Sequence, residues 1–152
     1  MKKIVALLIC LPLLAQAAFR FKDYQVEAYI GPRHNVTLNK DTKQFKSRFI
    51  ETGKMPINFA GHYVVNSFGC GTGCARYFYV DVKTGEAKFL PEYLQVDYND
   101  QDCENEVYFK PDSRLFVVSG MQKGSCSVNY YQELDGGFKF VGSQPLSKAV
   151  EQ

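Results

Sequence analysis

The sequence has little histidine, one of the residues from which metal sites are usually built. Its 152 residues include two histidines, His34 and His62, and neither stands beside two cysteines at the Cys-x-x-Cys spacing of common zinc sites. An acidic run could offer oxygen ligands to calcium, but it lacks the turn glycine and the terminal glutamate of an EF-hand loop. We therefore expect neither a metal nor another cofactor, and we interpret the run as a solvated loop. Its acidic residues are Asp97, Asp100, Asp102 and Glu104.

Net charge is also nearly absent. Lys2 and Lys3 are two of the 18 basic residues, so the chain that follows them has 16 basic and 16 acidic residues. This balance argues against binding to nucleic acid or to anionic membranes, because both require many uncompensated cations. Residues 20–54 nevertheless carry eight basic and four acidic side chains, and residues 92–106 carry six acidic and no basic ones. This asymmetry suits a polar partner surface, although a solvated face or neutralisation within the fold is the simpler interpretation.

The apolar run at residues 4–14 is too short to cross a bilayer as a stop-transfer helix. Two lysines precede it and the small residues AQAA follow, which is the layout of a secretory signal peptide. We expect residues 1–17 to be removed and residues 18–152 to form one domain in the periplasm or outside the cell, without stable insertion into a membrane. A lipid anchor on Cys10 is the alternative, but no small residue directly precedes this cysteine.

Four of the five cysteines lie beyond the predicted signal peptide. An even number of cysteines in an exported chain indicates disulfides, and four cysteines permit three pairings. We favour Cys70 with Cys74 and Cys103 with Cys126, because either alternative ties the first two cysteines to two separate places. The chain-entropy model assigns about 3 kcal/mol to the longer of these loops and less to the shorter one.

The chain beyond the signal peptide has signals for one helix followed by strands. Residues 38–53 predict a helix, which Asn39 or Asp41 can cap, and Phe45 and Phe49 would share its apolar face. The following segments are rich in β-branched and aromatic residues and are separated by turn signals. They are GHYVVNSF, RYFYVDV, a short strand after the KTG turn, NEVYFK, LFVVSG, SVNYYQEL and FKFVG. We therefore predict an α+β fold: a curved antiparallel meander of about seven strands with the N-terminal helix packed on one face.

The segment FGCGTGC, residues 68–74, joins two of these strands. A phosphate-binding P-loop or a Rossmann turn would lead into a helix, whereas an aromatic strand follows here. The glycines permit tight backbone angles and add little bulk, so a disulfide can close a protruding knuckle or merely reinforce a hairpin turn. The predicted binding loop consists of Gly69, Cys70, Gly71, Thr72, Gly73 and Cys74.

A thiol-dependent enzyme is the main alternative to a disulfide-closed loop. Such a redox or hydrolytic enzyme would use Cys70 or Cys74 as the reactive thiol and His62 as the base. The Cys-x-x-x-Cys spacing differs from the Cys-x-x-Cys motif that thioredoxin-like enzymes place at a helix start. His62 also lies at the far end of the preceding strand. Export and the even cysteine count favour a structural disulfide.

Side chains close to the loop can widen a binding surface. Exposed tyrosines suit protein interfaces, and alternate residues of a strand point to opposite faces. We expect most of the aromatic residues to lie in the core. The predicted supporting surface consists of His62, Arg76, Tyr77 and Tyr79.

Residues 58–91 resemble a pattern found in exported bacterial proteins of unassigned function. This pattern has a strand that ends in GCGTGC, an aromatic or apolar strand, then D-x-KTG and LP. More loosely, an exported α+β protein with a cysteine-closed loop between two strands is similar to the Ivy-type inhibitors of vertebrate lysozyme. This resemblance implies a loop that enters an enzyme's cleft. The present loop is shorter than theirs and has Thr72 with glycines in place of a histidine-bearing centre.

From these features we expect a non-enzymatic periplasmic or secreted protein that binds another protein through its disulfide-closed loop. The partner class that fits best is a hydrolase or toxin acting on the cell envelope, for which this protein would be an inhibitor or an immunity factor. The alternatives are the thiol-dependent enzyme and a structural envelope protein whose loop has no partner.

Overall fold

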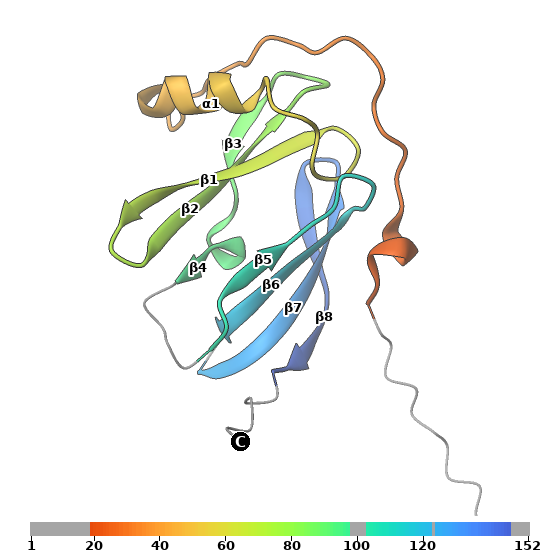
Figure 1. Cartoon of the computed structure of the whole chain (residues 1–152), viewed down its shortest axis with the longest axis vertical. Helices are drawn as coiled ribbons and strands as arrows, with labels where there is room; N and C mark the ends of the chain where they lie inside the picture. The colour runs from red at the N-terminus through yellow and green to blue at the C-terminus, as the bar shows by residue number, and fades with distance from the viewer. Residues whose placement is uncertain (1–18, 98–102, 123, 147–152) are drawn as a thin grey trace, which may run out of the picture.

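The computed structural model describes residues 19–97, 103–122 and 124–146, and the predicted signal peptide lies outside these ranges. Within them the chain forms one α-helix, three short 3-10 helices and eight strands (Figure 1). No helix there has the length and apolar character needed to cross a membrane. The elements are η1 (Phe21–Tyr24), η2 (Lys43–Phe45), α1 (Lys46–Thr52), β1 (Tyr63–Gly71), β2 (Cys74–Asp81), β3 (Ala87–Phe89), η3 (Glu92–Leu94), β4 (Val96–Asp97), β5 (Glu106–Tyr108), β6 (Leu115–Gln122), β7 (Ser125–Leu134) and β8 (Gly137–Pro145).

The strands form two four-stranded antiparallel sheets, and the predicted α+β class is confirmed. In the first sheet β2 pairs with β1, β3 and the short β4, and the second sheet has the order β5-β6-β7-β8. We expected one curved sheet, but the meander divides after β4. The physical reason is that both faces of the first sheet carry apolar side chains, so the second sheet is needed to cover one of them.

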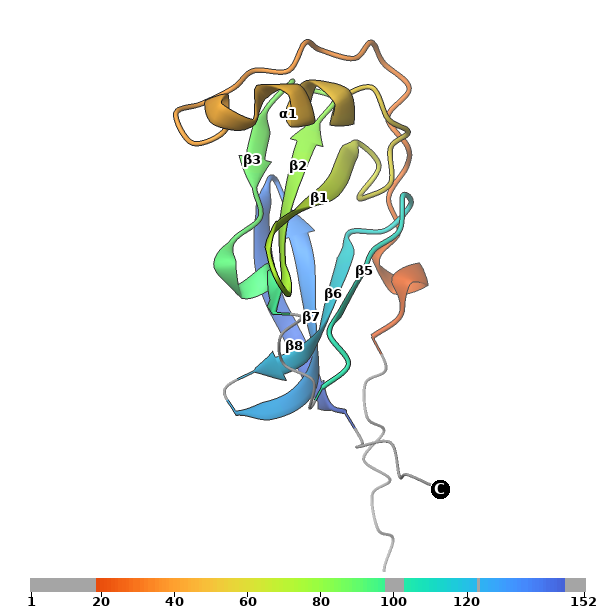
Figure 2. The same ribbon diagram turned by 60° about the vertical axis from the view of Figure 1, so that its left-hand side comes forward.

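The main hydrophobic core contains residues from both sheets. Figure 2 shows the sheets offset along the long axis, with β1–β3 toward α1 and β5–β8 toward the other end of the molecule. Tyr63 and Val65 of β1 and Tyr79 of β2 point into this core, as the two-residue period of a strand requires. Its buried members include Tyr63, Val65, Tyr79 and Val96 from the first sheet and Phe116, Val118 and Tyr131 from the second.

Helix α1 covers the opposite face of the first sheet. The Phe49 ring lies 4.5 Å from that of Phe78, measured between centroids. The helix is shorter than the predicted span of residues 38–53, because the side chain of Asn39 closes a turn first. Its Oδ1 accepts hydrogen bonds from the amides of Asp41 (2.9 Å) and Thr42 (3.0 Å). This local hydrogen bonding competes with regular helix and delays the α-helical turns to Lys46.

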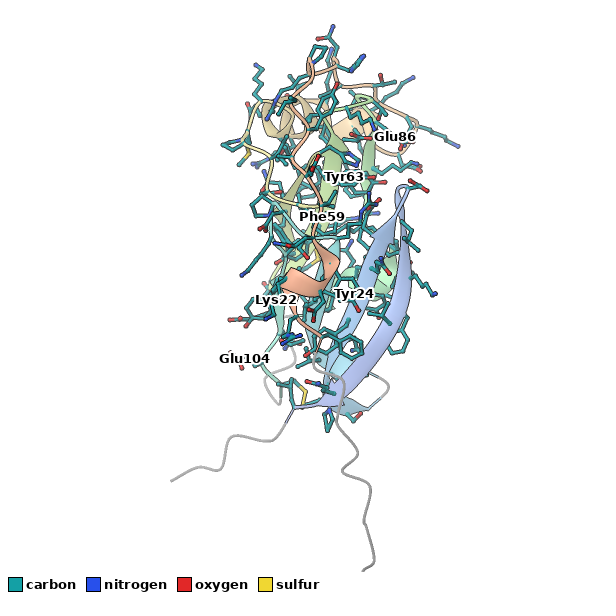
Figure 3. All side chains as sticks on the ribbon, turned by 90° about the vertical axis from the view of Figure 1, so that its right-hand side faces the viewer. Lys22, Tyr24, Phe59, Tyr63, Glu86 and Glu104 are labelled. Carbon is teal, nitrogen blue, oxygen red and sulfur yellow. A yellow bond between two sulfur atoms is a disulfide. The ribbon has the colours of Figure 1, made fainter. Side chains whose placement is uncertain are left out.

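The residues before α1 form an extended N-terminal strap, residues 19–38, that runs along both sheets. At its start the Phe19 ring stacks on Tyr130 with 4.6 Å between centroids. Figure 3 shows η1 of the strap, with Lys22 and Tyr24, lying beside the second sheet. Further along, the Thr37 amide donates to Gly85 O at 2.7 Å, in the first sheet's β2–β3 turn. The strap thus ties together elements that are far apart in the sequence.

Candidate functional site

The hairpin formed by β1 and β2 carries the predicted binding loop at its tip. The two strands pair antiparallel from Tyr63 opposite Asp81 to Gly71 opposite Cys74, with an irregularity between Gly69 and Gly71. Their β-branched and aromatic residues favour this extended pairing. In Figure 1 the tip of this hairpin projects at the left of the molecule. The local sequence therefore places the glycine loop at an exposed end of the first sheet.

The tip is cross-linked and exposed. Cys70 and Cys74 form a disulfide with 5.1 Å between their Cα atoms, which confirms the predicted pairing. Gly71 and Gly73 have φ values of +140° and +67°, which residues with a Cβ atom rarely adopt. A Cβ atom added to Gly71 would meet nothing within 4 Å, and the Thr72 side chain is exposed. The loop is therefore a protruding knuckle and is not folded under the sheet.

A groove of about 670 Å³ lies beside the tip. Arg76 is one of its lining residues, and the guanidinium of this side chain lies 3.9 Å from the centre of the Phe89 ring. Gln95 fixes one wall, because its side chain accepts a hydrogen bond from the Tyr77 amide (2.7 Å) and donates one to Leu90 O (2.8 Å). Arg76 and Glu92 give this surface charges of both signs. The lining residues are Cys70, Gly73, Cys74, Ala75, Arg76, Glu92, Gln95, Val96 and Met121.

The predicted supporting residues separate into two groups. Arg76 is exposed in the groove beside the tip, and Tyr77 is half-buried and packs against the main core. Tyr79 is only 3% exposed, so it contributes no surface beside the loop. His62 precedes the opposite end of β1 and also lies away from the tip. These two placements correct the predicted supporting surface, since the second sheet covers the face on which Tyr79 lies.

His62 pairs with a carboxylate instead of a thiol. Its Nδ1 lies 2.9 Å from Oδ1 of Asp81, which also accepts a hydrogen bond from the Lys83 amide (2.8 Å). The other carboxylate oxygen, Oδ2, accepts one from Thr84 Oγ1 (2.9 Å). Burial alone would raise the pKa of Asp81, but these hydrogen bonds outweigh it and lower the pKa below its ordinary value. This arrangement anchors the turn between β2 and β3.

The thiol-dependent arrangement is not brought together. Cys70 and Cys74 are joined as a disulfide, so neither presents a thiolate in this state. The eight residues from His62 to Cys70 run mostly along β1, which corresponds to a separation of about 27 Å. A base at that distance cannot accept a proton from either sulfur atom.

A buried polar network joins the two sheets and was not anticipated. Glu133 of β7 is 1% exposed and accepts hydrogen bonds from the Tyr63 hydroxyl (3.0 Å) and from Arg114 Nη1 (2.9 Å). The Gly136 amide also donates to this carboxylate, at 2.8 Å. Burial, reinforced by Glu133, raises the pKa of the Tyr63 hydroxyl far above its ordinary value. The alternation that places Tyr131 in the core predicts an inward Glu133 as well, and this was the available sequence signal.

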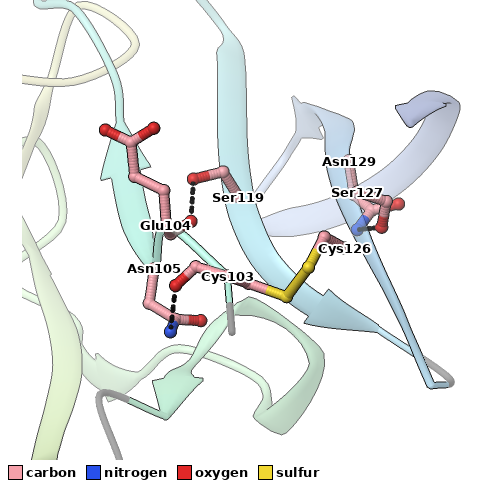
Figure 4. The surroundings of a disulfide bond; sticks show 7 residues. All are labelled: Cys103, Glu104, Asn105, Ser119, Cys126, Ser127 and Asn129. Atoms are coloured by element: carbon pink, nitrogen blue, oxygen red, sulfur yellow. Dashed lines mark hydrogen bonds between the residues drawn. A yellow bond between two sulfur atoms is a disulfide. The ribbon is translucent and has the colours of Figure 1, made fainter. Parts of the chain in front are cut away.

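The second disulfide anchors the start of β5 to β7 (Figure 4). Cys103 and Cys126 have Cα atoms 5.5 Å apart, which confirms the second predicted pairing. Beside it Asn105 Nδ2 donates to Cys103 O (3.0 Å), and Ser119 Oγ donates to Glu104 O (2.8 Å). Together with the disulfide, these bonds hold the segment just before β5 against β6 and β7.

The acidic run is only partly described. Glu104 is exposed, and the backbone of Asp97 pairs with Cys74 in the first sheet. Asp100 and Asp102, the other candidate calcium ligands, lie outside the described residues. Among the residues that are described, no three His, Cys, Asp or Glu side chains form a group suited to a metal ion.

No family model matches the chain, and no curated protein or solved structure matches it either. The candidate site is therefore defined by its own geometry, which combines an exposed cross-linked tip with an adjoining groove of polar and apolar side chains. The sequence pattern predicted the tip and Arg76 as parts of a binding surface, but it did not indicate Glu92, Gln95 and Met121. Met121 belongs to the other sheet, and nothing in the local pattern indicates that it approaches the hairpin.

Proposed function

We propose that this chain is a non-enzymatic periplasmic or secreted protein that inserts the tip of the β1–β2 hairpin into the cleft of another protein. The partner is a hydrolase or toxin that acts on the cell envelope, and the chain acts as its inhibitor or immunity factor. The observation that carries this proposal is the exposed tip at Thr72, which the disulfide between Cys70 and Cys74 closes.

The stiffness of the tip supports an inserted role. A loop that is already held in its bound conformation loses little conformational entropy when it docks. The disulfide limits the movement of the loop, because it joins two residues only four positions apart in the sequence. The pairing of β1 with β2 continues directly behind it. A rigid convex element of this kind suits a concave enzyme cleft better than a flat protein surface.

The adjoining groove supplies contact area that the tip alone lacks. A stable protein interface buries about 800 Å² on each partner, which exceeds what a few loop residues provide. Arg76 and Glu92 lie beside the tip and offer charges of both signs to the rim of a partner's cleft. Charges at such a rim mainly set the association rate and the choice of partner. The tip and the groove therefore form one candidate interface.

Binding and inhibition assays with a tip variant test the proposal. Pull-down from an envelope extract, together with inhibition assays on a panel of envelope hydrolases, should show a partner for the wild-type protein. Thr72→Trp places a large ring at the exposed tip and should abolish both binding and inhibition. Ser47→Trp makes a comparable change at an exposed position on α1 and should leave both unchanged.

Two results would contradict the proposal. If Thr72→Trp and Ser47→Trp bind the captured partner as well as the wild-type protein does, the tip lies outside the interface. If the captured partner is bound without loss of its hydrolytic activity, the inhibitory role is wrong even though binding stands.

A further inference from the structure

A second groove lies on the inward face of the second sheet, and it shares no lining residue with the groove beside the hairpin tip. It has a volume of about 600 Å³ and is lined by residues of η3, β7 and β8. The strand register explains why they share a face, because Tyr131 pairs with Phe140 and Asn129 pairs with Ser143. The lining residues are Tyr93, Ser125, Ser127, Asn129, Tyr131, Phe138, Phe140 and Ser143. The core-facing side of the second sheet therefore continues beyond the buried core as an open groove.

One half of this groove consists of aromatic rings. Tyr93 and Phe140 are 46% and 54% exposed, which is high for side chains of this size, and both flank the buried Tyr131. Ring centroids are 5.5 Å apart for Tyr93 and Tyr131 and 5.6 Å apart for Tyr131 and Phe140. The Tyr93 hydroxyl donates to Phe138 O at 3.4 Å and so links η3 to β8. The rings are therefore held in place while two of them remain accessible.

The other half consists of small polar side chains. Ser127 and Asn129 are 8% and 6% exposed and form the floor, and Asn129 Nδ2 donates to Ser127 Oγ at 3.1 Å. Ser143 of β8 is exposed on the opposite side of this floor. Hydroxyl and amide groups both donate and accept hydrogen bonds, which suits a ligand that presents many hydroxyl groups.

The charge of the lining excludes several ligand classes. No Lys, Arg, Asp, Glu or His is among the described residues that line the groove. Phosphates and nucleotides are bound through cations or clusters of amide donors, and metal ions require carboxylate, imidazole or thiolate ligands. A neutral ligand with apolar ring faces and polar edges matches the groove, and a carbohydrate has both.

We propose that this groove binds a neutral oligosaccharide. The rings of Tyr93 and Phe140 stack on the apolar faces of sugar rings, and Ser127, Asn129 and Ser143 hydrogen-bond the hydroxyl or acetamido groups at their edges. The groove volume falls within the range of small-ligand pockets and accommodates a short chain of sugars. A peptide that adds to a sheet pairs with the backbone of an edge strand, whereas this groove lies on a sheet face.

Titration with defined sugars tests this site. Residues 18–152 are titrated with neutral trisaccharides, namely N-acetylated chitotriose, cellotriose, maltotriose and mannotriose, by calorimetry and by amide chemical shifts in NMR spectra. At least one of them should bind at millimolar concentration or below, with shifts confined to β7, β8 and η3. Phe140→Ala should weaken that binding about tenfold through the loss of one stacking contact.

Two further variants separate the groove from the rest of the surface. Ser143→Arg places a long charged side chain in the groove. It should weaken binding at least as much as Phe140→Ala does, and it should leave the fold intact because position 143 is exposed. Tyr108→Ala removes an aromatic ring that is 44% exposed but lies outside the groove, and it should leave the affinity unchanged. Thr72→Trp should also bind sugar normally, so this result is independent of the partner proposed for the hairpin.

Several results would overturn the proposal. Absence of binding by all four sugars at millimolar concentration would do so, as would sugar binding that Phe140→Ala and Ser143→Arg do not weaken. Chemical shift changes in the groove with an apolar peptide, but with none of the sugars, would reassign the groove to peptide binding.

Discussion

Glu133 is the residue through which the two sheets are most directly coupled by polar contacts. It lies in the second sheet and accepts a hydrogen bond from Tyr63 of the first, while Arg114 compensates its charge. A carboxylate buried to 1% exposure is costly unless its oxygens are paired, and here both oxygens have donors. The network therefore favours one relative placement of the two sheets over others.

Tyr63→Phe should lower the free energy of unfolding by about 1–3 kcal/mol, because a buried carboxylate loses a hydrogen bond without gaining water. Tyr29→Phe is the matched control, since its hydroxyl donates to Pro32 O (3.0 Å) at the surface. This control should change the free energy by less than about 0.5 kcal/mol. Urea unfolding followed by circular dichroism measures both, and equal costs would show that Glu133 does not depend on Tyr63.

For single residues, the sequence predicted which cysteines pair, but it did not predict which side chains are exposed. The even number of cysteines beyond the predicted signal peptide and the spacing of Cys70 and Cys74 were sufficient to identify both disulfides. The burial of Tyr79 was not predictable in the same way. Alternation along a strand shows which residues share a face, but it does not show that a second sheet covers that face.

Among the elements, the two disulfide-linked segments differ in what their cross-links constrain. One disulfide closes the tip of a hairpin whose strands already pair on either side, with a sequence separation of 4. The other has a separation of 23 and links the chain before β5 to β7, across the intervening β6. In the chain-entropy model the longer closed loop contributes more to stability, because it restricts more of the unfolded chain.

Removal of the two disulfides should therefore have unequal effects. The Cys103→Ser/Cys126→Ser pair should lower the free energy of unfolding by about 3 kcal/mol, and the Cys70→Ser/Cys74→Ser pair by about 2 kcal/mol. Chemical unfolding of the two double variants measures this order. Thiol titration of the native wild-type protein is the control and should detect no reactive thiol before reduction. A reversed order would show that the tip stabilises the fold more than its loop length implies.

For the helix and the sheets, sequence patterns predicted some features and not others. The apolar spacing of Phe45 and Phe49 identified the helical segment and the face that packs on the first sheet. The start of α1 was misplaced because the Asn39 side chain competes for the first amides. The division into two sheets depends on contacts between distant strands, such as those that place Met121 near the hairpin tip, and no local pattern encodes them.

At the scale of the whole molecule, the N-terminal strap connects the two sheets although most of it is irregular in structure. It contacts the second sheet through Phe19 and the first through the hydrogen bond from Thr37 to Gly85. Between these points the Val26 amide donates to Asp112 O at 3.0 Å, and the Tyr29 amide donates to Gly61 O at 2.8 Å. The strap therefore bonds to the turns at the ends of strands in both sheets and links the two sheets from outside.

Gly142→Ala should loosen the start of the strap, because a Cβ atom at this position overlaps the Phe19 ring. The amides of Val26 and Arg114 take part in the hydrogen bonds between the strap and the turn before β6. Their hydrogen exchange should become at least about tenfold faster, equivalent to about 1.4 kcal/mol. Gly69→Ala is the control, since the nearest atom to its added Cβ, Cys74 O, is 3.9 Å away. Unchanged exchange in Gly142→Ala would show that Phe19 does not anchor the strap.

The strap also constrains the order in which the molecule can assemble. Phe19 and Tyr24 are made early during synthesis, yet their contacts lie at Arg114 and Tyr130, roughly a hundred residues further along the chain. Contacts of such long sequence separation form only after the loop between them has closed, which makes them slow to establish. The first part of the domain to leave the ribosome is thus among the last to reach its final position, and until then Gly61, Gly85 and Asp112 lack the hydrogen bonds that the strap supplies.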